Sequence, residues 1–116
     1  MRALVLLLLL GCSRGDAEPV AAPDRGYASS RSRLEQRRVE LARDFSRHRS
    51  SRLAEARELL VATLRDKILP AWDGTVWDFN GTSQTPQQGM IACGYFVATT
   101  LLHLGLQVER VRMGQQ

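Results

Sequence analysis

The stretch ACGYFVATTLLHLG, residues 92–105, places a cysteine where an apolar helix should begin, directly after a loop rich in Pro, Gly and Gln. Its apolar residues predict a helix over residues 92–103, and Gly105 suits the left-handed position that ends many helices. A helix N-terminus carries unpaired backbone N–H groups and favours negative charge, as cysteine nucleophiles require. Cys93 is therefore the candidate nucleophile; the alternative interpretation is a small buried apolar residue.

The segments on either side of this helix differ in character. Residues 71–88 contain Trp72, Trp77 and Phe79 together with many small polar residues, which predicts an ordered loop or short strand held by aromatic anchors. Residues 106–113 alternate between apolar and polar types, which predicts a short half-buried strand.

Residues 32–69 form a basic segment whose apolar positions recur at steps of three, four and seven, as in an amphipathic helix. Ser32 and Glu35 have the spacing of a capping box, which predicts the start of the helix. Pro70 predicts its end, and the polar residues 48–51 suggest a break into two helices.

The chain has a net charge of +4, and residues 25–67, with twelve basic and six acidic residues, alone carry +6. Acidic and basic residues three positions apart, such as Glu35 and Arg38, explain this composition as a solvated amphipathic helix. The alternative is contact between residues 31–67 and anionic lipid headgroups. Nucleic acid is not an expected partner, because the chain has the features of an exported protein.

These features lie at the N-terminus. Arg2 precedes an apolar run over residues 3–10, which is far shorter than the roughly 20 residues of a membrane span and indicates an export signal over 1–11. Leu9-Leu10-Gly11-Cys12 resembles a bacterial lipobox, so we expect lipid on Cys12, a tether over 12–31 and a membrane-anchored protein of the bacterial envelope, on the periplasmic or outer-membrane side. The alternative is an ordinary signal peptide with an incidental Cys12. A lipidated Cys12 leaves Cys93 unpaired in an oxidising compartment.

Residues 81–116 resemble the core of NlpC-type cysteine peptidases, which belong to the papain-like superfamily. The matching positions are Cys93, Phe96-Val97, Gly105, Arg110, and Gln115 or Gln116. The resemblance implies an α+β fold, predominantly helical here, in which the helical arm precedes the N-terminal half of a papain-like fold over 70–116. It also implies that Cys93 is the nucleophile, that its backbone N–H helps to form an oxyanion hole, and that the substrate is a peptidoglycan peptide.

The chain departs from that family in two ways. Ala-Cys-Gly-Tyr-Phe replaces the usual Asp-Cys-Ser-Gly-Phe, and the family's downstream histidine has no counterpart, so we expect a C-terminally truncated, inactive peptidase. His103 would lie ~15 Å from Cys93 along one helix, too far to act as base. It is expected to be a surface or helix C-terminal histidine that complements the helix dipole. His48 lies in the basic arm.

The alternative function is a non-enzymatic envelope lipoprotein that acts as a binding module. No cofactor or metal is expected, because the cysteines and histidines lack paired spacing and the glycines match no nucleotide motif.

Overall fold

The computed structural model describes residues 23–116, which form helices and one small sheet, so the predominantly helical α+β class is confirmed. The predictions for the export signal, for Cys12 and for residues 13–22 lie outside the described residues. The elements in chain order are α1 Pro23–Arg43, α2 Arg49–Thr63, the π-helix η1 Leu64–Ile68, α3 Leu69–Trp72, β1 Val76–Trp77, β2 Met90–Ile91, α4 Cys93–His103 and α5 Arg110–Gly114.

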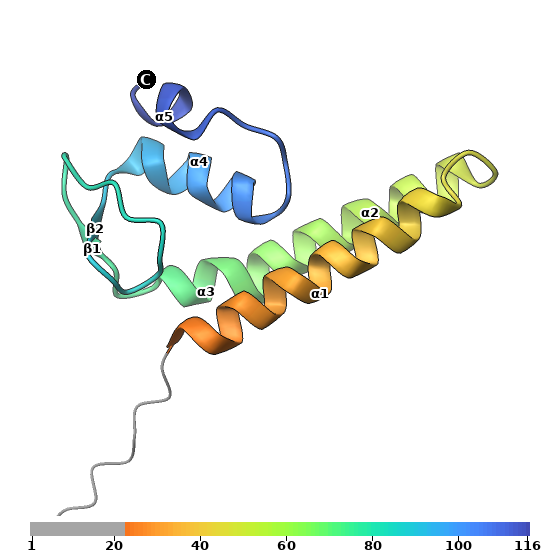
Figure 1. The fold of residues 1–116 in the computed structure, drawn as a ribbon, viewed down its shortest axis with the longest axis horizontal. Coiled ribbons are helices and arrows are strands. Elements are labelled where there is room, and N and C mark those ends of the chain that lie inside the picture. The colour runs from red at the N-terminus through yellow and green to blue at the C-terminus, as the bar shows by residue number, and fades with distance from the viewer. Residues whose placement is uncertain (1–22) are drawn as a thin grey trace, which may run out of the picture.

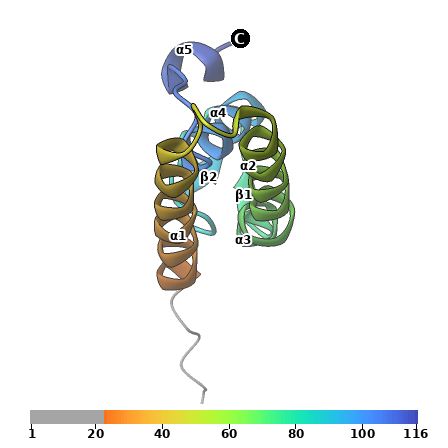
Figure 2. The ribbon, with the colours of Figure 1, turned by 90° about the vertical axis from the view of Figure 1, so that its right-hand side faces the viewer.

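Helices α1 and α2 lie side by side as a long antiparallel hairpin, with the strands, α4 and α5 packed at its open end (Figures 1 and 2). The predicted break is confirmed, since a turn over residues 44–48 separates the two helices. Tyr27, Leu34 and Leu41 are seven residues apart on α1 and are all buried. One stripe of α1 therefore supplies the apolar contacts of the hairpin.

The predicted helix start at Ser32 is wrong. Helix α1 begins at Pro23, so residues 23–31 of the expected tether are helical and Ser32 lies inside the helix. A proline fits the first turn of a helix because its missing N–H would have no partner there. Glu35 does not cap the helix but pairs with Arg38, at 2.6 Å.

The prediction that Pro70 ends the helical arm is also wrong. The five-residue π-helix η1 precedes it, and the Leu69 N–H donates to the carbonyl of Leu64. This wide turn lets Pro70 sit in the first turn of α3, where its ring and missing N–H are tolerated. The helical path therefore continues to Trp72, and Ile68 and Trp72 both reach the core.

Strands β1 and β2 are parallel, with Val76 opposite Met90 and Trp77 opposite Ile91. The connection between them folds back, so that Thr82 forms an antiparallel bridge to Ile91 on the other edge of β2. The prediction of an ordered loop or short strand is therefore confirmed for residues 73–88, whereas Ala71 and Trp72 belong to α3.

The predicted aromatic anchors differ in their environments. Trp72 is buried, and Trp77 packs edge-on against Phe96 with ring centroids 5.3 Å apart. Phe79 is 93% exposed, so its prediction as an anchor is wrong.

The C-terminal segment confirms one prediction and overturns another. Gly105 has φ +85°, and the N–H groups of Gly105 and Leu106 donate to the carbonyls of Leu102 and Leu101, as in a Schellman motif. The strand predicted over residues 106–113 is wrong. No strand lies beside this segment within residues 23–116, and its backbone forms the short helix α5 instead.

A chain of buried hydrogen bonds joins the hairpin to α4. The indole N–H of Trp72 donates to the hydroxyl of Tyr27 at 3.0 Å, and this hydroxyl lies 2.8 Å from Nδ1 of His103. Tyr27 is near the start of α1, Trp72 ends α3 and His103 ends α4. Three segments that are distant in sequence therefore meet at one hydroxyl group.

We predict that Tyr27→Phe lowers the free energy of unfolding by about 2 kcal/mol or more, because it leaves two buried polar atoms without partners. Urea unfolding followed by tryptophan fluorescence measures this change. The matched control is Tyr95→Phe, whose hydroxyl makes no hydrogen bond in the described part of the chain and should change stability by less than about 0.5 kcal/mol. Equal losses in the two variants would contradict the prediction.

Candidate functional site

Cys93 is the first residue of α4, and its side chain is exposed. The buried Ile91 of β2 fixes the chain just before it, and the extended Ala92 is the N-cap. No side chain caps the helix, and its first backbone hydrogen bond runs from the Phe96 N–H to the carbonyl of Ala92, at 2.8 Å. The N–H groups of the first turn therefore stay available beside the thiol. The interpretation of Cys93 as a buried apolar residue is wrong.

Cys93 opens into a pocket of about 610 Å³. Aromatic side chains form much of its lining, and the C-terminal end of the described chain forms the opposite wall. The lining residues are Trp77, Asp78, Phe79, Ala92, Cys93, Gly94, Tyr95, Gly114, Gln115 and Gln116. The structure thus brings together three residues of the predicted family pattern: Cys93 and both candidate glutamines.

Arg110 holds α5 in place as a wall of this pocket. Its Nε donates to Oγ1 of Thr99 at 2.7 Å, and a terminal nitrogen donates to the carbonyls of Thr82 and Ser83 at 2.7 and 2.8 Å. The guanidinium also lies over the ring of Tyr95, 4.8 Å from its centroid. Partial burial lowers the pKa of the Arg110 guanidinium. Arg110 therefore links α5 to α4 and to the loop, and does not face the thiol as a ligand-binding group.

Two glycines allow α4 and α5 to approach closely. A Cβ atom on Gly94 would lie only 2.4 Å from the carbonyl oxygen of Gly114, and one on Gly114 would lie 2.7 Å from the ring of Tyr95. The first of these contacts involves backbone, which cannot move aside as a flexible side chain does. Gly94 therefore sets the position of the pocket wall that faces Cys93.

The ionisable side chains that line the pocket are those of Asp78, Cys93 and Tyr95, and none is an imidazole. One oxygen of the Asp78 carboxylate accepts a hydrogen bond from the backbone N–H of Asn80 at 2.8 Å, which orients this side chain. Among residues 23–116, no group of three or more His, Cys, Asp or Glu side chains is arranged to hold a metal ion.

His103 lies at the opposite end of α4 from Cys93, as the sequence predicts, but it is buried and not at the surface. Burial lowers its pKa to about 4, with smaller contributions from the positive charges of Arg31 and Arg110. At neutral pH it is therefore uncharged, so the expected interaction of a cationic His103 with the helix dipole is wrong. We assign Nδ1 as the acceptor of a hydrogen bond from Tyr27, because the buried hydroxyl proton of Tyr27 would otherwise have no partner, while the same oxygen accepts from the indole N–H of Trp72.

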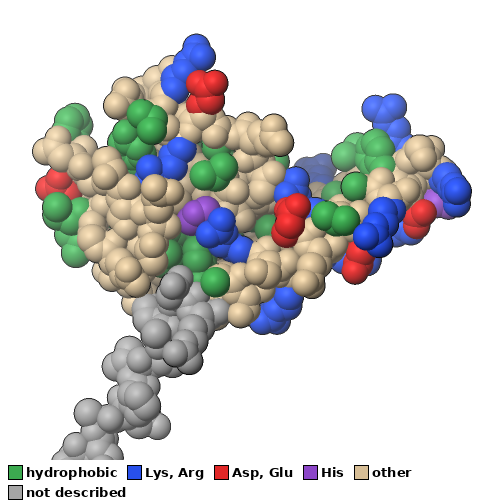
Figure 3. Space-filling model, viewed as in Figure 1, with side chains coloured by type: hydrophobic (Ala, Val, Ile, Leu, Met, Phe, Trp, Pro, Cys, Tyr) green, Lys and Arg blue, Asp and Glu red, His purple; other side chains and the backbone are tan. Residues whose placement is uncertain are grey.

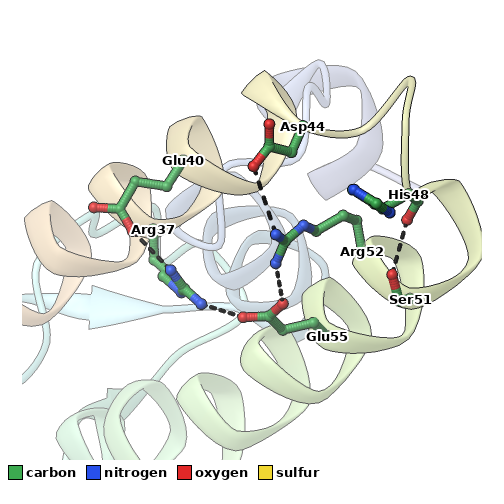
Figure 4. A network of polar contacts seen from close by, with 7 residues as sticks. All are labelled: Arg37, Glu40, Asp44, His48, Ser51, Arg52 and Glu55. Atoms are coloured by element: carbon green, nitrogen blue, oxygen red, sulfur yellow. Dashed lines mark hydrogen bonds and ion pairs between the residues drawn. The ribbon is translucent and has the colours of Figure 1, made fainter.

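His48 is the N-cap residue of α2, in the turn at the far end of the hairpin from the pocket (Figures 1 and 4). Neither histidine is placed to accept the proton of Cys93.

The sequence did not identify the aromatic walls of the pocket as a group. Trp77 is in β1 and Phe79 is in the turn that directly follows it, so no strand or helix period predicts that their side chains share a surface. Gly114 and Tyr95 join them through the packing of α5, which the predicted strand over 106–113 excluded.

The comparisons with known proteins add no relative: no protein-family model, no curated protein and no solved structure matches this chain. Within the described range, none of the helices combines the length and the apolar character needed to cross a membrane.

We predict that the free energy of unfolding falls by about 2 kcal/mol as the pH decreases from 6.5 to 4, allowing for partial screening. The unfolded chain protonates His103 near pH 6.5 and the folded chain only near 4, so in this window the unfolded state binds more protons. The stabilisation is complete above pH 6.5 and is lost on acidification. Urea unfolding at several pH values measures it.

The variant His103→Gln separates this effect from the titration of carboxylates, because an amide oxygen can accept the Tyr27 hydrogen bond without titrating. Its stability should change less between pH 6.5 and 5 than that of the natural chain. Identical pH dependence in the two proteins would refute the assignment to His103.

Proposed function

We propose that this chain is a bacterial envelope lipoprotein whose Cys93 pocket derives from a papain-like, NlpC-type cysteine peptidase and binds short peptides of the cell wall without hydrolysing them. The observation that carries this proposal is an exposed cysteine at the start of α4, in an aromatic pocket with no imidazole. The succession of strand, cysteine and helix supports the papain-like comparison, and the lipobox supports the location.

The pocket has features that suit a peptide. Trp77, Phe79 and Tyr95 offer apolar surface, and the side-chain amides of Gln115 and Gln116 can donate and accept hydrogen bonds. The uncapped N–H groups at the start of α4 can bind a carbonyl oxygen or a carboxylate.

Hydrolysis requires more than this arrangement provides. A thiol that attacks an amide must lose its proton to a base, and the departing amine must receive one. Within the described residues, His103 is engaged by Tyr27 and His48 is at the hairpin tip, so neither can serve. We therefore infer binding, with Cys93 as the contact residue, and no turnover by this chain alone.

A second candidate is an interaction module whose pocket receives a side chain of another envelope protein. The observation in its favour is that two aromatic side chains of the pocket lining are exposed next to one another, Phe79 at 93% and Trp77 at 55%, so that a partner's side chain could cover both.

The binding proposal predicts selective labelling of Cys93. A cell-wall stem peptide that carries a terminal chloromethyl ketone should alkylate Cys93 at least ten-fold faster than a scrambled peptide with the same group, in a Cys12→Ala background. Intact-mass spectrometry measures the rates. Gly94→Ala should remove most of the peptide preference, because the new methyl group displaces α5, while iodoacetamide should still alkylate the thiol.

Cys93→Ser is the matched control and should not be labelled. Equal rates for the two peptides would overturn peptide binding in favour of the interaction module. Release of fragments from purified peptidoglycan by the natural chain, lost in Cys93→Ser, would overturn the inference that it does not hydrolyse.

The location is tested at Cys12. We predict that Cys12→Ala moves the protein from the membrane fraction to the soluble fraction after a high-salt wash, because two or more acyl chains anchor a protein stably and a short apolar run does not. Detergent extraction and fractionation of bacterial cells measure this change. Cys93→Ala should remain in the membrane fraction, and retention of Cys12→Ala there would refute lipid anchoring.

A further inference from the structure

We propose that the hairpin tip docks on a bilayer surface that carries anionic headgroups. The tip is defined here by Arg43, Phe45, Arg47, Arg49 and Leu53, which surround the turn between α1 and α2. All five side chains are exposed.

The acidic residues next to the tip are already neutralised. Arg52 pairs with Asp44 at 3.5 Å and with Glu55 at 2.8 Å, and thereby joins the two helices (Figure 4). Glu55 also pairs with Arg37, which in turn pairs with Glu40 at 2.8 Å. This network joins the two helices of the hairpin. It also occupies the carboxylates that could otherwise neutralise the positive charge of the tip arginines.

The three tip arginines keep their charge uncompensated. Across the described chain, Arg43, Arg47 and Arg49 form no ion pair within 4.0 Å. Figure 3 shows basic side chains gathered at this end of the hairpin. An anionic surface would supply the missing counter-charge, with about 1 kcal/mol, or roughly a five-fold gain in affinity, for each basic residue near it.

Apolar side chains lie among these charges. Leu53 is 59% exposed and Phe45 is 37% exposed, and the guanidinium of Arg49 lies 5.8 Å from the centroid of the Phe45 ring. Arginine beside an aromatic ring suits the boundary between headgroups and acyl chains, where the ring enters the apolar side and the charge stays with the headgroups.

The same charge distribution disfavours nucleic acid as the partner. A nucleic acid is bound through several phosphates along a continuous basic track. Along the sides of the hairpin, Arg37, Arg38 and Arg52 are paired with carboxylates, which interrupts such a track (Figure 4). The three tip arginines instead surround one narrow end of the molecule.

Docking at the tip leaves the Cys93 pocket free. The strands and α5 lie at the other end of the molecule from the turn between α1 and α2 (Figure 1), and α1 alone is about 30 Å long. The hairpin would therefore hold the pocket away from the membrane surface that the tip contacts.

The test uses the full chain with Cys12→Ala, so that lipidation plays no part. Its partition is measured by co-sedimentation with phosphatidylcholine vesicles and with vesicles that also contain phosphatidylglycerol, at low salt. Binding to the first kind reports the apolar N-terminal residues. We expect the additional binding to the second kind to fall on the order of 100-fold in Arg43→Gln/Arg47→Gln/Arg49→Gln.

The matched control is Arg33→Gln/Arg57→Gln/Lys67→Gln. It removes three exposed basic residues that also lack ion pairs but lie away from the tip, in α1, α2 and η1. It should lose less than about ten-fold, and Phe45→Ser should lose several-fold. Equal losses in the two triple variants would overturn the tip in favour of net charge. Binding of a DNA duplex that is lost with the tip arginines, without vesicle binding, would overturn the bilayer as partner.

Discussion

The hydroxyl group of Tyr27 is the interaction on which the arrangement of the molecule most depends. It accepts a hydrogen bond from Trp72 and donates one to His103, and each partner ends a different helix. Apolar packing alone would permit α4 to slide over the hairpin, because apolar contacts have no direction. Two buried hydrogen bonds at one atom allow a single position, since any displacement would leave polar atoms unsatisfied in the core.

The pocket depends indirectly on the position of α4 against the hairpin. Helix α4 carries Cys93 at the end opposite to His103, so the contact with Tyr27 fixes the helix while its other end remains open to solvent. Arg110 then attaches α5 to the exposed part of α4 and completes the wall. The His103 end of α4 therefore stabilises the fold, and the Cys93 end is available to a ligand. Substitutions at one end need not affect the other.

The sequence predicted what local rules determine and missed what packing determines. The helix after Cys93 and the left-handed Gly105 were predictable, because helical spacing and a glycine at C′ act within a few residues. The strand over 106–113 was not formed, because an alternating pattern forms a strand only where a neighbouring strand is available. The burial of His103 was missed for a similar reason: its partner, Tyr27, is near the other end of the described chain. The separation of Cys93 from His103 followed from helix geometry and was predicted.

The π-helix η1 determines the direction in which Trp72, at the end of the helical path, faces the hairpin. Leu60, Leu64, Ile68 and Trp72 follow one another at intervals of four residues and all contribute to the core. In a uniform α-helix such a row would drift by about 40° per step and turn Trp72 away from the hairpin. The wider turn of η1 offsets this drift, so that Trp72 still faces the hairpin. If η1 adopted regular α-helical turns with the same number of residues, everything that follows would rotate by on the order of 100°, and Trp72 would separate from Tyr27 without a change in either side chain.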